Sequence, residues 1–119
     1  MKTVRRYLVM TLVLLLVATA AEAGIEERRG RVTFLRVHDV GTKFGPPTDQ
    51  IDVEVVVKLD SHPDEAYGFQ LRNDAQGPAR AGMLDLLRDA FRGGTSVILD
   101  VNVVPGHKNS TILRVALTR

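Results

Sequence analysis

Five segments with strand character and one amphipathic helix between the third and the fourth predict an all-β domain with one helix. The expected fold is a five-stranded OB-fold barrel in the order β-β-β-α-β-β. Three features lead to this prediction. Apolar residues alternate with polar ones in the strand segments, and short polar turns separate neighbouring strands. Only one helix is indicated, whereas a ferredoxin-like fold needs two crossover helices.

The N-terminal segment, residues 1–23, has the order of a cleaved secretory signal peptide. A positively charged start precedes an almost continuously apolar run at residues 7–20. Small residues, Ala21 and Ala23, occupy the two positions that a signal peptidase reads. As a helix the apolar run would reach about 21 Å, short of the ~30 Å hydrocarbon core of a bilayer. We expect cleavage before Gly24, an exported protein in the periplasm or outside the cell, and no stable membrane anchor.

Cleavage would leave a domain without net charge. The whole chain has sixteen Lys and Arg residues and fourteen Asp and Glu residues. The segment that is removed contains three basic residues and one acidic residue, so thirteen of each remain. A neutral domain lacks the basic excess of a nucleic-acid-binding protein, and no nucleic-acid partner is expected. The chain has no cysteine, which excludes disulfides, thiolate metal ligands and a cysteine nucleophile.

The first half of the domain reads as two strands joined by a long turn region. Residues 24–30 are charged and lack periodicity, so we interpret them as a flexible leader and place the OB-fold domain at residues 31–119. Residues 31–40 carry apolar side chains on both faces, as in a long strand that curves or contains a bulge. Residues 41–49 are dense in turn formers. Residues 50–59 alternate between apolar and polar apart from Val56, which predicts a strand with one buried face.

A third strand is predicted over residues 66–72, after a polar turn. Tyr67, Phe69 and Leu71 share one face of this strand, and we expect that face to be buried. Gly68 lies between the two aromatic residues, where a bend or a close approach of another chain segment is expected.

The helix is predicted over residues 79–92, between Pro78 and the pair Gly93-Gly94. Its apolar residues fill one broad arc that would close one end of the barrel, with Met83, Leu87 and Phe91 at the centre.

The last two strands are predicted at residues 95–104 and 111–118, with a turn between them. On the outward faces of the strands we expect three apolar residues, Val56, Ile98 and Ile112. Such residues would suit a contact between subunits, and a homo-oligomer is one expected partner arrangement.

The apolar motifs of the third strand, the helix and the fourth strand resemble those of a known group of proteins. The motifs are Tyr67-Gly68-Phe69-x-Leu71, Met83-Leu84-x-Leu86-Leu87-x-x-Ala90-Phe91 and the strand from Val97. They are similar to small exported bacterial OB-fold proteins that resemble the B subunits of pentameric toxins, in particular the subtilase-cytotoxin B type. The resemblance implies glycan binding and assembly into rings. This chain departs from those subunits in lacking their disulfide cysteines, and no glycan-contact residue is matched.

Two constellations with catalytic or metal-binding residue types have a simpler interpretation. His62 lies between Asp60 and Asp64, but the spacing matches no metal-loop signature, and a solvated acidic turn is expected. Ser61 or Ser110 could be combined with a histidine and an aspartate, but no nucleophile-elbow motif is present. The sequence therefore predicts neither an enzyme, nor a metal site, nor a cofactor.

Two aromatic residues are the candidate ligand contacts. Domains of this fold bind ligands on the face of the second and third strands and on nearby loops, often by stacking on aromatic rings. Phe44 lies in the turn region and Tyr67 in the third strand. We expect a non-enzymatic exported binding module whose ligand is a glycan or an envelope protein. The alternative is a structural or stress-related periplasmic protein that acts by self-association or by binding an envelope partner.

Overall fold

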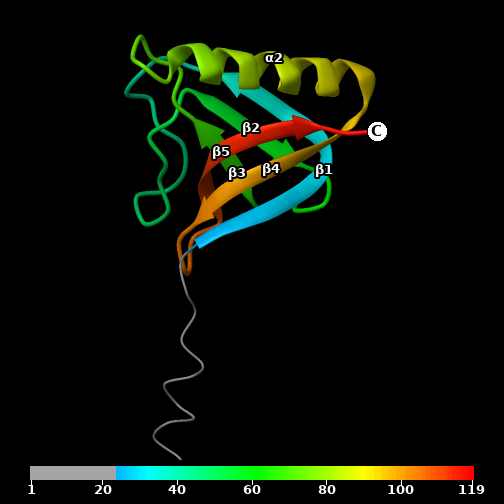
Figure 1. Ribbon diagram of the computed structural model, residues 1–119. Helices are drawn as coiled ribbons and strands as arrows, with labels where there is room; N and C mark the ends of the chain where they lie inside the picture. Colours follow the sequence, from blue (N-terminus) through cyan, green and yellow to red (C-terminus); the bar gives the residue numbers. More distant parts are fainter. Residues whose placement is uncertain (1–23) are drawn as a thin grey trace, which may run out of the picture.

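A computed structural model describes residues 24–119 and shows a closed five-stranded barrel with one helix (Figure 1). The elements in chain order are β1 (Gly24–Val37), β2 (Val55–Leu59), β3 (Ala66–Phe69), α2 (Gly77–Gly93), β4 (Ser96–Val103) and β5 (Asn109–Leu117). The strands are neighbours in the order β1-β2-β3-β5-β4, and β4 closes the barrel on β1. The predicted OB-fold and its element order are confirmed. The signal-peptide prediction concerns residues 1–23 and lies outside the described residues.

Strand β1 pairs with two neighbouring strands. Its first half, from Gly24 to Arg31, pairs with β4, and its second half pairs with β2. The register shifts between Val32 and Phe34, which is the bulge that lets one long strand turn around the barrel. The interpretation of residues 24–30 as a flexible leader is therefore wrong. Most of the side chains of residues 24–30 face solvent. Because neither face of this part of the strand is buried, its sequence shows no alternation of apolar and polar residues.

Strand β2 is shorter than predicted. Residues 50–54 leave the ladder, apart from an isolated bridge between Ile51 and Phe44. Val56 was expected on the outward face but is fully buried, because residues 38–54 fold back over the barrel at this point. Alternation identified an apolar strand, but it could not show that both faces are covered.

The helix α2 lies across one end of the barrel (Figure 1). Leu87 and Ala90 are buried against the main core, and Met83 packs beside them. Gly94 ends the helix in the left-handed conformation at φ 64°, as the glycine pair predicted. Phe91 is 49% exposed, so its expected place at the centre of the buried arc is wrong. Within residues 24–119, no helix is long and apolar enough to span a membrane.

Strand β5 contains a second irregularity that reverses part of its predicted pattern. Asp100 faces Arg114, whereas Val101 faces Ile112, so Leu113 is the extra residue. Ile112 consequently points into the core at 5% exposure, although it was expected outside. Leu113 is 47% exposed.

Candidate functional site

The connection between β1 and β2, residues 38–54, covers the outer face of the barrel. Ile51, Val53, Val56 and Ala66 form a second apolar cluster there, separate from the barrel core. Val53 lies directly over Gly68 of β3, where an added Cβ would come within 2.5 Å of Val53 Cγ2. The close approach expected at Gly68 is therefore a side chain of this connection. The outer β2–β3 face, on which the fold commonly binds ligands, is occupied by the chain itself.

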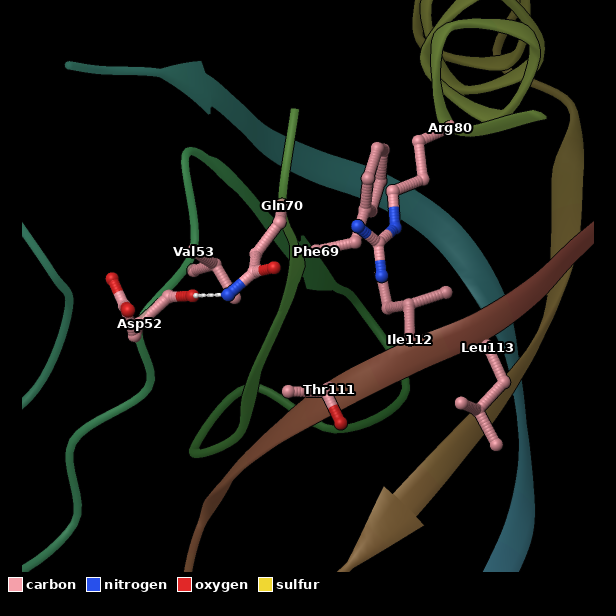
Figure 2. A pocket seen from close by; sticks show the side chains of 8 residues that line it. All are labelled: Asp52, Val53, Phe69, Gln70, Arg80, Thr111, Ile112 and Leu113. Atoms are coloured by element: carbon pink, nitrogen blue, oxygen red, sulfur yellow. Dashed lines mark hydrogen bonds between the residues drawn. The ribbon is translucent and has the colours of Figure 1, made fainter. Parts of the chain in front are cut away.

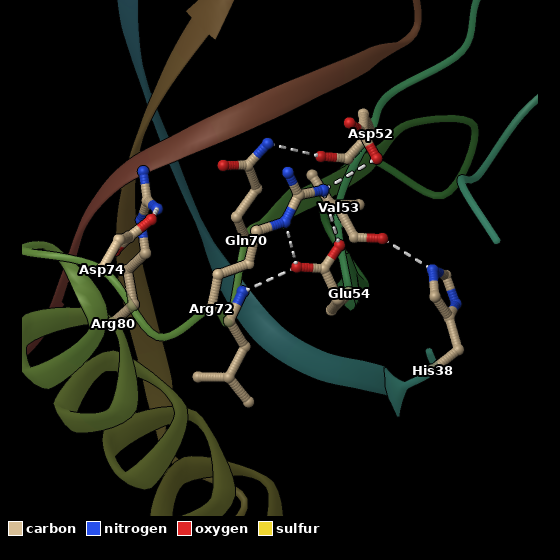
Figure 3. Close-up of polar contacts among 9 residues, drawn as sticks. His38, Asp52, Val53, Glu54, Gln70, Arg72, Asp74 and Arg80 are labelled. Carbon is tan, nitrogen blue, oxygen red and sulfur yellow. Dashed lines mark hydrogen bonds and ion pairs between the residues drawn. The ribbon is translucent and has the colours of Figure 1, made fainter. Parts of the chain in front are cut away.

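The acidic residue Glu54 anchors one end of this connection (Figure 3). Its side chain is buried, and its carboxylate accepts hydrogen bonds from Leu71 N at 3.1 Å, Arg72 Nε at 2.9 Å and Arg72 Nη2 at 3.1 Å. Arg72 also donates to Asp52 Oδ1 at 3.0 Å. The hydrogen bonds to Glu54 and then to Asp52 raise the pKa of Arg72, which keeps this cation charged.

Asp49 anchors the middle of the connection to the turn that precedes β5. Its carboxylate accepts hydrogen bonds from Lys108 N at 2.7 Å and Asn109 N at 3.2 Å. The side-chain amide of Asn109 donates to the Asp49 carbonyl at 2.8 Å. Within the connection itself, His38 Nε2 donates to the Val53 carbonyl at 2.6 Å (Figure 3). These contacts fix residues 38–54 in place on the barrel.

Tyr67 is buried and does not offer its ring to solvent. It is 0% exposed, and its hydroxyl donates to Glu65 Oε2 at 2.7 Å. Burial, together with this hydrogen bond to a carboxylate, raises the pKa of Tyr67. Arg28 of β1 donates to Glu65 Oε2 from Nε at 3.2 Å and to Oε1 from Nη2 at 3.3 Å. The expectation that Tyr67 stacks on a ligand is wrong, because Tyr67 belongs to the core and its hydroxyl to an internal ion-pair network.

A cavity of about 230 Å³ lies where β3 and β5 diverge (Figure 2). The two strands run in parallel only as far as Gly68 and Thr111. The residues that line the cavity, which we call the notch, are Asp52, Val53, Phe69, Gln70, Arg80, Thr111, Ile112 and Leu113.

The polar groups of the notch come from three elements. Arg80 extends into it from the first turns of α2, and its only ion pair among residues 24–119 is a long one, 3.8 Å to Asp74. Gln70 follows β3 and donates from Nε2 to the Asp52 carbonyl at 3.2 Å, which leaves its amide oxygen free to accept. Thr111 of β5 is exposed and contributes a hydroxyl. Asp52 also lines the notch, and apolar side chains, among them Phe69, supply the rest of the lining.

A second surface feature contains Phe44, the other candidate ligand contact. We define the basic–aromatic patch as Phe34, Arg36, Phe44 and Lys58. Arg36 Cζ lies 5.8 Å from the Phe34 ring centroid and 5.3 Å from that of Phe44. Lys58 Nζ lies 5.7 Å and 6.0 Å from the same two centroids. Phe44 is half-buried on the second apolar cluster, so its ring supports the two cations.

The candidate catalytic and metal-binding residues do not form a reactive arrangement. Ser61 donates its hydroxyl hydrogen to the Arg29 carbonyl, and His62 Nδ1 lies 2.9 Å from Ser61 Oγ. With that hydrogen already donated, Ser61 Oγ can only accept from His62, so His62 does not activate it as a base. Ser110 is buried. In residues 24–119, no three His, Asp or Glu side chains come together as metal ligands would.

The chain has no significant match among protein-family models, curated proteins or solved structures. Sequence reasoning missed the notch because Gln70 and Arg80 carried no motif. One signal in the sequence could have indicated that the outer β2–β3 face is covered. A glycine within a strand, here Gly68, often marks the close approach of another chain segment.

Proposed function

We propose that this protein is an exported, non-enzymatic binding module that holds one end of a glycan in the notch. The observation that supports this proposal is the composition of the notch. A guanidinium from Arg80, a hydroxyl from Thr111 and an amide oxygen from Gln70 surround an apolar lining. A sugar ring presents the complementary set, since its hydroxyls donate and accept hydrogen bonds and its C–H faces pack on apolar side chains.

The dimensions of the notch also favour a small terminal unit. A volume of about 230 Å³ is below the ~300–1,000 Å³ that drug-sized ligands occupy. Its groups come from α2, β5 and the end of β3, elements that pack on one core, so the site needs little ordering when a ligand binds. Export, which the N-terminal sequence predicts, would place the notch where envelope and cell-surface glycans occur.

The test is a glycan array with protein purified after expression of the full chain, followed by calorimetry on the best ligand. We expect Arg80→Ala to weaken binding at least tenfold and Thr111→Val about two- to tenfold, since a hydrogen bond contributes ~1.5–3 kcal/mol when one group is charged and ~0.5–1.5 kcal/mol when both are neutral. Arg88→Ala is the matched control, because Arg88 is exposed on the same helix and pairs with Asp85. The proposal fails if no glycan binds, or if the control weakens binding as much as the notch variants do.

A second candidate function is self-association, and the exposed apolar side chains of α2 favour it. Phe91 is 49% exposed and Leu86 is 36% exposed. Light scattering across micromolar to near-millimolar concentration distinguishes the two functions. An oligomer that dissociates in Phe91→Ser and binds no glycan would favour self-association.

A further inference from the structure

In the basic–aromatic patch two cations lie against the same two aromatic rings and take no part in the ion pairs of residues 24–119. Six arginines between residues 24 and 119 form ion pairs with carboxylates; they are Arg28, Arg29, Arg72, Arg80, Arg88 and Arg114. Among the described residues, no carboxylate lies within 4.0 Å of the cationic nitrogens of Arg36 or Lys58. These two cations instead converge on the same two aromatic rings.

The backbone brings the two cations together on one face. In the β1–β2 ladder Phe34 faces Lys58 and Arg36 faces Val56, so Arg36 and Lys58 are diagonal neighbours on the outer face. Side chains at such diagonal positions are within reach of one another when they are long. Phe44 is held beside them by the bridge to Ile51, in which Phe44 N donates at 2.9 Å and Ile51 N donates at 2.8 Å.

The aromatic rings compensate the two charges only in part. A cation–π contact at an exposed site contributes ~0.5–1 kcal/mol, which does not remove the repulsion between two like charges. An anion between the two cations would remove it. An anion with two charges matches this pair, whereas one carboxylate neutralises only one cation.

We propose that the basic–aromatic patch binds a phosphate monoester. At neutral pH this group carries a charge of about −1.5 to −2 and has three acceptor oxygens. An arginine can bind two of those oxygens with its planar fork, while a lysine supplies a point charge. Arg36 and Lys58 provide one of each.

Two other polyanions fit less well. A nucleic-acid backbone is a diester with one charge per phosphate, and single strands are usually bound by stacking bases on open aromatic rings. The rings of Phe34 and Phe44 are approached by the chain's own cations. A membrane surface is usually bound by clusters of about 4–8 basic residues, and this patch has two.

The phosphate could be carried by a sugar or by a lipid headgroup, and the test separates these sources. Chemical shifts of the ¹⁵N-labelled protein are followed on addition of inorganic phosphate, glucose 6-phosphate or glucose. Sedimentation is measured with phosphatidylcholine vesicles that contain or lack phosphatidic acid. We expect glucose 6-phosphate to shift the amides of Arg36 and Lys58 and glucose to leave them unchanged.

The charge variant is R36Q/K58Q, and its matched control is R29Q/R88Q, which removes two exposed arginines elsewhere. Melting temperatures of all variants confirm that each protein is folded. We expect R36Q/K58Q to weaken phosphate binding at least tenfold and the control to change it less than twofold. For the wild-type protein, binding should weaken between pH 7.5 and pH 5, because the second pKa of a phosphate monoester is about 6.

Several results would overturn the proposal. These are equal losses in the two double variants, equal binding of a sugar carboxylate and a sugar phosphate, tighter binding of single-stranded DNA than of either phosphate, or no binding up to millimolar concentration. Vesicle binding that requires phosphatidic acid would support the site and assign it to a lipid. Because the patch and the notch share no residue, glycan binding in the notch can fail while phosphate binding holds, and the reverse.

Discussion

Replacement of the buried carboxylate Glu54 by the isosteric Gln tests how residues 38–54 are held on the barrel. Gln keeps the shape and one carbonyl oxygen, so the hydrogen bond from Leu71 N can persist. What is lost is the charge that Arg72 Nε and Nη2 contact at 2.9 and 3.1 Å. Each hydrogen bond to a charged group contributes ~1.5–3 kcal/mol. The Arg72 side chain is 29% exposed, so water and Asp52 recover part of that loss.

The expected cost of Glu54→Gln is therefore about 2–3 kcal/mol of unfolding free energy, below the ~3–5 kcal/mol found when a fully buried pair is broken. In a domain of this size that corresponds to a decrease in melting temperature of about 10–20 °C. The control is Asp52→Asn, which removes a carboxylate that contacts the same arginine but is 47% exposed, and its expected cost is about 0.5 kcal/mol.

Urea unfolding at pH 7 measures both variants, and hydrogen exchange of residues 50–54 measures whether the connection opens locally. We expect faster exchange there in Glu54→Gln, since Glu54 joins the connection to Leu71 in the segment that follows β3. Equal losses of stability in the two variants would refute the reasoning. They would show that the buried carboxylate of Glu54 stabilises the fold no more than the exposed carboxylate of Asp52 does.

Two further predictions concern the core. Burial alone would raise the pKa of Glu65, but the hydrogen bonds from Tyr67 and Arg28 outweigh it and hold that pKa below 4.5. The ionised carboxylate therefore stabilises the fold above pH 4.5, and this contribution is lost as the pH falls through the lowered pKa. Glu65→Gln should therefore lower the unfolding free energy at pH 7, and its difference from wild type should shrink as the pH falls below 4.5; a difference independent of pH would contradict this assignment. Leu87→Ala should cost about 2–5 kcal/mol because Leu87 is fully buried, whereas Phe91→Ala should cost about 1 kcal/mol or less because Phe91 is half exposed. Thermal unfolding of the two variants checks the orientation of α2, which is wrong if the larger loss belongs to Phe91.

The sequence was sufficient for the fold because alternation and a single helix leave few barrels to choose from. It was insufficient where a neighbour distant in the chain decides burial. Val56 is buried by the connection that precedes its own strand, and Ile112 by an extra residue in β5. Phe91 lay within the apolar arc of the helix, but only contact with the barrel shows where that arc ends.

The polar sites were hidden for the same reason. Asp49 accepts hydrogen bonds from residues about sixty positions further along the chain, and no spacing rule reaches that far. Gln70 and Arg80 line the same cavity because the end of β3 and the first turn of α2 both lie beside β5. Phe44 was identified from the sequence as a candidate contact, yet its role in the proposed phosphate site depends on the cations that two strands place beside it.

The covered face also explains how a neutral domain can present cationic sites. Residues 38–54 bring Glu54 and Asp52 to Arg72, and Asp49 to the turn before β5, so three of the four carboxylates of this connection are used internally. Arg36 and Lys58 remain beside it without such partners among the described residues. A net charge of zero therefore does not exclude recognition of an anion. The local charge of a surface determines which ligands it attracts, and here the cations without ion-pair partners lie apart from the carboxylates.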